Sequence, residues 1–102
     1  MLVVHAVLPI RPDARDAFLG AVGGLVEATR AEPGVLEYGL HESVESPGTF
    51  TMVERYVDEG AFEAHLGSAH FQAAAAGLGE WLAGPPSITK YRSDDGEAVA
   101  LG

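Results

Sequence analysis

Two side chains near the middle of the sequence could do acid–base chemistry. His65 shares one face of a predicted helix with apolar residues, and an imidazole there can act as a general base because it titrates near neutral pH. Glu54 lies on an apolar face of a predicted strand, where a carboxylate is costly unless it is paired. We expect Glu54 to pair with His65 and to orient its ring. The alternatives are that Glu54 pairs with Lys90 and that His65 is a structural histidine at the edge of the core.

Further side chains could contact a substrate near this pair. Four aromatic residues are candidates to line a pocket: Tyr38, Tyr56, Phe71 and Trp81. Aromatic residues at such spacing also form ordinary cores. His70 is another candidate, but it follows His65 by five residues, so the two rings share a face only if the helix breaks at Gly67-Ser68. With such a break, Ser68 and His70 could instead cap the next helix.

Several other kinds of site find no support in the sequence. The absence of cysteine excludes disulfides, thiolate metal sites and a cysteine nucleophile. The four histidines are separated by 36, 24 and 5 residues, which matches no zinc motif, so we expect no metal ion. Nucleotide binding and serine hydrolysis lack their phosphate-loop and G-x-S-x-G motifs.

The charge balance argues against nucleic acid and membranes as partners. The chain has 15 acidic and 6 basic residues, and the basic residues are scattered rather than clustered. No apolar run reaches the roughly 18–20 residues that span a bilayer. The apolar N-terminus lacks the basic flank and cleavage site of a signal peptide. With the absence of cysteine, this predicts a cytoplasmic protein.

The elements that must position these groups follow from the hydrophobic spacing. Apolar residues recur at every second position in the predicted strands and at every third or fourth in the predicted helices, with Asp13 and Asp58 as helix N-caps. The predicted order is strand (2–10), helix (13–32), strand (35–42), strand (50–57), broken helix (58–82) and strand (87–92). This order is the split βαβ, or ferredoxin-like, pattern of an α+β domain. It places the helices on one face of a four-stranded antiparallel sheet.

The strands also indicate how the domain assembles. We expect one domain over 1–92 and an acidic C-terminal tail over 93–102. Several strands are apolar on both faces, as where Val3 is followed by Val4. An uncovered apolar sheet face is rare on a monomer. We therefore expect a homodimer that packs sheet against sheet.

Three blocks of sequence carry a resemblance to a known family. They have the forms E-x-G-x-x-x-Y, T-F-x-x-x-E-x-Y and A-x-x-x-H-x-x-S-x-H-F. Their fixed positions are Glu32, Gly34 and Tyr38; Thr49, Phe50, Glu54 and Tyr56; and Ala61, His65, Ser68, His70 and Phe71. The chain resembles the antibiotic-biosynthesis-monooxygenase family over nearly its whole length.

The resemblance implies a dimeric α+β barrel and an enzymatic activity. Better-studied members of the family oxidise quinols or polycyclic aromatic phenols with O₂ and use no flavin, haem or metal. We therefore expect a cofactor-independent monooxygenase that acts on a small quinol or aromatic phenol, with His65 as the base that removes a phenolic proton. Two alternatives remain open: an isomerase or other proton-transfer enzyme acting on a small hydroxycarbonyl compound, and a non-catalytic ligand-binding module.

Overall fold

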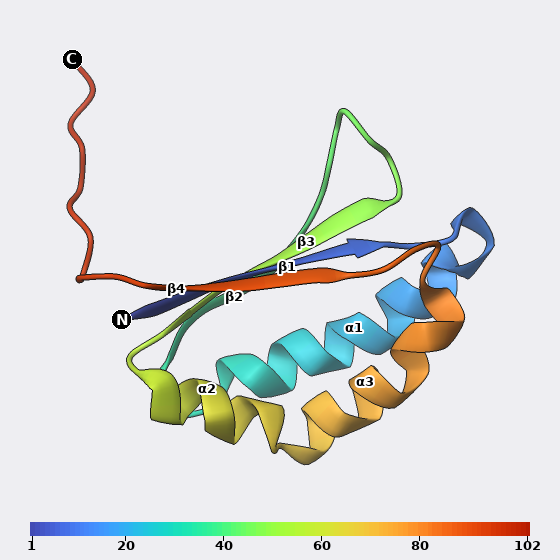
Figure 1. Cartoon of the computed structure of the whole chain (residues 1–102), viewed down its shortest axis with the longest axis horizontal. Helices are drawn as coiled ribbons and strands as arrows, with labels where there is room; N and C mark the ends of the chain where they lie inside the picture. Colours follow the sequence, from blue (N-terminus) through green and yellow to red (C-terminus); the bar gives the residue numbers. More distant parts are fainter.

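The computed structural model describes residues 1–102 as two layers, one of strands and one of helices (Figure 1). The strands are β1 (Leu2–Pro9), β2 (Val35–Glu42), β3 (Thr49–Tyr56) and β4 (Ser87–Arg92). The helices are α1 (Arg15–Arg30), α2 (Glu59–Leu66) and α3 (Ala69–Trp81), with a 3-10 turn at Pro12–Ala14. The order of elements confirms the predicted ferredoxin-like α+β fold.

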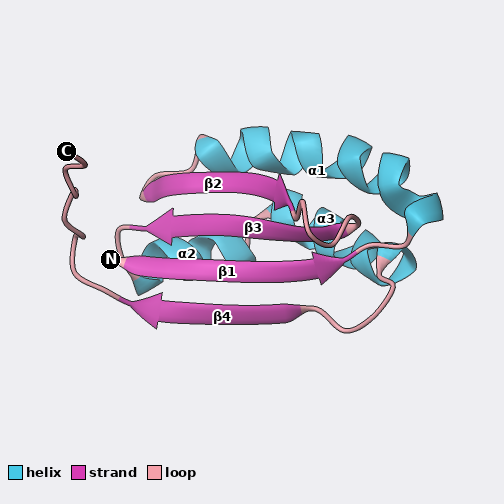
Figure 2. Cartoon of the chain, turned by 90° about the horizontal axis from the view of Figure 1, so that it is seen from above, coloured by secondary structure: helices cyan, strands magenta, loops and turns pink.

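The four strands form one antiparallel sheet in the order β2-β3-β1-β4 (Figure 2). The register places Glu54 of β3 directly between Tyr38 of β2 and Val4 of β1. Alternate residues of a strand point to the same face of the sheet. The sheet therefore brings residues from distant parts of the sequence into one row on the face that the helices cover.

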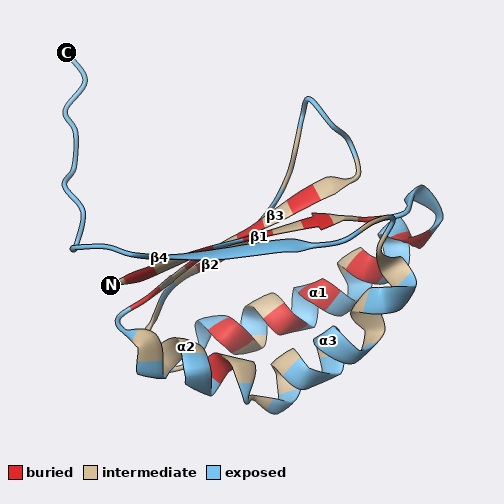
Figure 3. Cartoon of the chain, in the orientation of Figure 1, coloured by how far each residue is buried: buried red, intermediate tan, exposed pale blue.

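The core lies between the sheet and the helices, all of which cover the same face (Figures 1 and 3). Helix α1 contributes Phe18, Val22 and Leu25, whose spacing of four and three residues makes one apolar stripe. This stripe packs against buried side chains of the strands, among them Leu8 and Met52. Burial of such side chains stabilises the fold by about 1.5–3 kcal/mol each.

The other face of the sheet carries no helix (Figures 1 and 3). Val3, Val7 and Val53 lie half-buried on it, beside an ion pair in which Arg55 Nε lies 2.7 Å from Glu37 Oε1. This face is therefore partly apolar and partly charged. Residues 93–102 follow β4 as an exposed segment without helix or strand. No helix is both long and apolar enough to cross a membrane.

The start of α1 differs from the prediction. Asp13 lies inside the 3-10 turn and caps no helix, because the turn already begins after Arg11. Pro12 occupies the first position of this turn, where its fixed φ and missing N–H are favourable. The 3-10 turn therefore begins after Arg11, and α1 follows it with Ala14 as its N-cap, one residue later than Asp13 indicated.

Candidate active site

His65 lies in the last turn of α2, where a break between two helices fixes its position. Asp58 caps α2, and its carboxylate accepts a backbone N–H of the first turn at 2.9 Å, as predicted. Ser68 caps α3 and also donates its hydroxyl to the His65 carbonyl at 2.6 Å. The predicted break at Gly67-Ser68 is therefore confirmed, and hydrogen bonds hold both of its sides.

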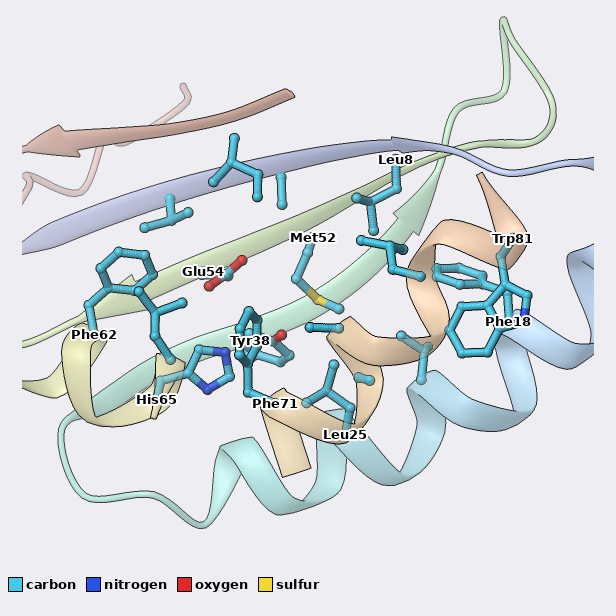
Figure 4. A pocket seen from close by; sticks show the side chains of 18 residues that line it. Leu8, Phe18, Leu25, Tyr38, Met52, Glu54, Phe62, His65, Phe71 and Trp81 are labelled. Atoms are coloured by element: carbon cyan, nitrogen blue, oxygen red, sulfur yellow. The ribbon is translucent and has the colours of Figure 1, made fainter. Parts of the chain in front are cut away.

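An apolar pocket of about 110 Å³ lies between the sheet and the helices (Figure 4). Side chains from all four strands and all three α-helices line it, and 16 of the 18 lining residues are hydrophobic. The other two are Glu54 and His65. The groups that the sequence identified as candidates for acid–base chemistry are thus the only titratable side chains there besides Tyr38.

The His65 ring is held on one edge and unbonded on the other. Its Nδ1 lies 2.9 Å from Glu32 Oε2, while its Nε2 is buried and has no hydrogen-bond partner. In Figure 4 one ring nitrogen faces the side of the pocket that holds Tyr38 and Glu54. The rings of Tyr38 and Phe71 flank the imidazole, with centroids at 5.1 and 5.0 Å. The free nitrogen therefore lies in a dry, aromatic environment.

Glu32 determines which nitrogen of His65 carries the proton. Burial by itself would raise the pKa of Glu32, but its hydrogen bonds to His65 and His70 outweigh burial and hold the pKa below its usual range. An ionised carboxylate accepts hydrogen bonds and donates none. The Nδ1 of a neutral His65 must therefore carry its hydrogen, which leaves a lone pair on Nε2. A base ready to take a proton from a ligand has this form.

The turn that carries Glu32 is built around a glycine. Gly34 has a φ of +83°, and a Cβ at this position would lie 2.8 Å from the Cβ of Ala61 in α2. Only glycine combines this backbone conformation with so close an approach. Gly34 therefore lets the segment after α1 lie against α2, which brings Glu32 within reach of His65.

His70 shares the same carboxylate. Its Nε2 lies 2.7 Å from Glu32 Oε2, the oxygen that also bonds His65. The three ligand-type atoms lie within 4.8 Å of one another, a spacing at which such atoms could share a metal ion. The two hydrogen bonds already account for this spacing, so the three residues form a hydrogen-bonded cluster.

Glu54 does not pair with His65, so the expected pairing is wrong, and it does not form the alternative pair with Lys90 either. Its Oε1 accepts a hydrogen bond of 2.5 Å from the hydroxyl of Tyr56, two residues away on the same face of β3. Lys90 instead bonds Glu59 at 3.1 Å, at the start of α2. Burial raises the pKa of Glu54 to about 7, and the bond from Tyr56 offsets this only in part. Near neutral pH this carboxyl is therefore present in both its acidic and its basic form.

Three of the five residues that we expected to contact a substrate line the pocket, and two do not. Tyr38, Phe71 and Trp81 line the pocket (Figure 4), and burial raises the pKa of Tyr38 above its usual range. Tyr56 does not line the pocket, and its ring packs in a separate cluster with Leu2 and Val4. His70 does not line it either, because the helix break turns its ring toward Glu32. Tyr56 and His70 therefore lie outside the pocket lining and bond Glu54 and Glu32.

Glu32 is the residue of the site that reasoning from sequence missed. It lies 33 residues before His65, in the turn that ends the first helix, and neither spacing nor periodicity links the two. Its only signal was its place in the E-x-G-x-x-x-Y block. Within this block, Glu32 lies two residues before Gly34, a glycine that the fold requires. This position was the available clue to a role for Glu32.

Fold and site together define a small α+β domain with one apolar acid–base pocket beneath its sheet. The chain belongs to the antibiotic biosynthesis monooxygenase family, whose family model matches residues 1–77. This confirms the resemblance that the three sequence blocks carry.

Individual relatives agree with this assignment. The chain is 37% identical over 90 residues to "Putative monooxygenase YcnE" of Bacillus subtilis, which covers 88% of this chain and 95% of the relative. It is 38% identical over 87 residues to "Putative monooxygenase Rv0793" of Mycobacterium tuberculosis, with 85% and 84% covered. The solved structure of Rv0793 superimposes with a TM-score of 0.88 over 95% of this chain and 98% of that one. A conserved protein from Methanosarcina mazei also gives 0.88, at 31% identity over 91% and 92% of the two chains.

Proposed function

We propose that the protein is a cofactor-independent monooxygenase that oxidises a small quinol or aromatic phenol with O₂. The observation that carries this proposal is the buried Nε2 of His65, which has no protein partner and belongs to the lining of an apolar pocket. An unbonded polar atom in such a place costs free energy unless a ligand bonds it. A phenolic hydroxyl is a ligand of matching chemistry, with an apolar ring for the pocket and one proton for the imidazole.

The chemistry requires a base and a dry site. Removal of the phenolic proton by His65 Nε2 gives an electron-rich phenolate, which can reduce O₂. For a phenol with a free para carbon, one oxygen atom becomes the second carbonyl of a quinone and the other leaves as water. The substrate supplies all four electrons, so the reaction needs no other reductant. The apolar lining excludes water and so protects the oxygen intermediates.

Glu54 supports the later steps of the same reaction. Because burial raises its pKa to about 7, part of the Glu54 population is protonated at neutral pH and can donate a proton to reduced oxygen. Tyr56 holds this carboxyl in place through the bond of 2.5 Å. The pocket thus combines a base on α2 with an acid on β3.

The pocket volume favours a substrate with a single ring. An engineered apolar cavity of about 150 Å³ holds benzene. The pocket here is of comparable size, about 110 Å³, so it accommodates one ring more readily than a fused aromatic system. Phe71 and Trp81 supply flat surfaces on which such a ring can pack.

An oxygen electrode tests this function. Chelator-treated protein is mixed with single-ring hydroquinones and phenols, and we expect O₂ uptake above the rate of autoxidation. The expected product is a quinone from a phenol and a hydroxyquinone from a hydroquinone, with one molecule of water formed in each case. The same acid–base pair could also serve an isomerase, for which turnover of a hydroxyketone under nitrogen is the diagnostic result. Binding of phenols with neither reaction would support a ligand-binding module. Either of these outcomes would contradict the monooxygenase.

We further propose that the protein is a homodimer that pairs through the open face of the sheet. Tyr91 is 52% exposed on β4, and the half-buried Val3 and Val53 lie on the two central strands of this face. Burial of this patch against a second copy would remove apolar surface from water. Sedimentation at micromolar concentration should then give about twice the chain mass of 10.6 kDa. A monomer at that concentration would contradict the dimer.

A further inference from the structure

A row of three hydrogen-bonded side chains leads from the pocket to the surface. His65 Nδ1 lies 2.9 Å from Glu32 Oε2, and His70 Nε2 lies 2.7 Å from the same oxygen. The exposed fraction of these side chains increases along the row, from 1% for His65 to 13% for Glu32 and 27% for His70. One end of the row therefore lies in the pocket lining, and the other end reaches water.

The break between α2 and α3 is what makes this row possible. In one continuous helix, residues five apart point about 140° away from each other, at 3.6 residues per turn. With the chain turned at Gly67-Ser68, the rings of His65 and His70 approach to 6.1 Å between centroids. Ser68 holds this turn through its bonds to the His65 carbonyl and to the first turn of α3.

Glu54, the other acid–base group of the pocket, has no comparable route to water. Its hydrogen bond leads to Tyr56, which is fully buried. The apolar side chains that line the pocket neither donate nor carry protons. A proton taken up in the pocket can therefore leave along hydrogen bonds only through Glu32 and His70.

We propose that His65, Glu32 and His70 form a proton path between the pocket and solvent. The proposal rests on the proposed function, in which a bound phenol is the source of the proton. The phenolic O–H breaks as Nε2–H forms on His65, and the Nδ1 proton of His65 passes to Glu32 Oε2. While Glu32 is ionised, His70 donates to it from Nε2, so outward transfer requires the partly exposed His70 ring to exchange first to the tautomer that carries its hydrogen on Nδ1. Protonated Glu32 then passes its proton to the free Nε2, and His70 releases the Nδ1 hydrogen to water, which restores the Nε2–H form.

The path runs in reverse later in the cycle. Reduced oxygen takes one proton from Glu54, which regains it from the C–H of the oxygenated ring carbon, and a second proton from the Nε2–H of His65. The Nδ1 of His65 then regains a proton from water through His70 and Glu32. No net proton is released, in agreement with the balance of the monooxygenase reaction. The pocket can thus lose and regain a proton while it remains closed to water.

Exchange of the His65 ring proton with water tests the path without substrate or O₂. Nuclear magnetic resonance on ligand-free protein with ¹⁵N-labelled histidine gives the exchange rate of the Nδ1–H. In His70→Gln the amide nitrogen can take the place of Nε2 and still donate to Glu32, but it cannot relay a proton. We expect exchange to become at least tenfold slower, and free imidazole in the buffer to restore it. The control His41→Gln changes an exposed histidine outside the site and should leave the rate unchanged.

A purely structural role of His70 predicts the opposite result. Loss of that ring would open Glu32 to water, so exchange at His65 would stay the same or become faster, and either outcome would overturn the proposal. Glu32→Gln is a second variant that interrupts the path at its centre and should also slow exchange. Addition of a chelator should not change the wild-type rate, whereas a change would indicate a bound metal and overturn the path. Since no substrate is used, failure of the oxygenase assay and failure of the path are separate results.

Discussion

Glu54→Gln should make the stability of the protein less dependent on pH. Glu54 is 5% exposed, and burial raises its pKa from the ordinary value of 4.5 to about 7. At about 1.4 kcal/mol for each unit of pKa, this rise corresponds to about 3 kcal/mol. Wild-type protein should lose this amount when the buried carboxyl ionises, and glutamine in its place has no charge to lose.

The direction of the effect follows from the raised pKa. The folded state binds the Glu54 proton more tightly than the unfolded state does, so its contribution is fully present below pH 4.5. It is lost progressively as the pH rises from about 4.5 through about 7. Glu32 acts in the opposite sense, since its lowered pKa contributes stability that is lost as the pH falls. The difference in the free energy of unfolding between wild type and Glu54→Gln therefore isolates the contribution of Glu54.

Urea unfolding at pH 5 and pH 8 measures this contribution of Glu54 to stability. We expect the free energy of unfolding of Glu54→Gln, relative to wild type, to rise by about 2–3 kcal/mol between the two pH values. The control Glu45→Gln changes an exposed glutamate and should show no such difference. If wild type and Glu54→Gln follow parallel curves with pH, Glu54 is not the buried, proton-retaining group that the structure indicates.

Three further substitutions test the packing and the assembly. Gly24→Ala should stabilise the protein by about 1 kcal/mol in urea unfolding, because a Cβ there meets no atom within 4 Å and α1 gains a better helix former; a loss of stability would show a contact not seen here. Gly34→Ala should destabilise the protein by more than 1 kcal/mol, because φ is +83° and Ala61 leaves no room for a Cβ. It should also lower oxygen uptake by displacing Glu32. Unchanged stability would contradict this account of the turn. If the protein is the proposed dimer, Val53→Lys places a charge on the open face of the sheet and should give a folded monomer in sedimentation; a dimer that persists would place the interface elsewhere.

Local signals in the sequence were sufficient for most of the fold. Periods of two and of three to four residues gave the order of strands and helices, and Asp58 and Ser68 cap their helices through bonds within three residues. The prediction for Asp13 failed for an equally local reason, since Pro12 is a stronger start signal than an aspartate one residue later.

The site could be predicted only in part, because its bonds join distant segments. His65 and Glu54 were recognised as candidates from their residue type and apolar surroundings, and both line the pocket. Their partners were not, because Glu32 reaches His65 through the close approach of the turn after α1 to helix α2, which periodicity does not encode. The hydroxyl of Tyr56, and not His65, bonds the carboxylate of Glu54, because Tyr56 and Glu54 lie on one face of the same strand.

His65→Asn combined with ¹⁸O₂ tests the central claim most directly. The side-chain amide of asparagine can take the place of Nδ1 and still donate to Glu32, whereas the unbonded Nε2 of the pocket lining is lost. Because His65 is buried and bonded, activity must be compared per folded molecule. We expect mass spectrometry to find one ¹⁸O atom in the product of the wild-type protein, and a rate about 10²–10⁴-fold lower for His65→Asn. A wild-type product without ¹⁸O, or a His65→Asn protein that forms labelled product at the wild-type rate, would contradict the account.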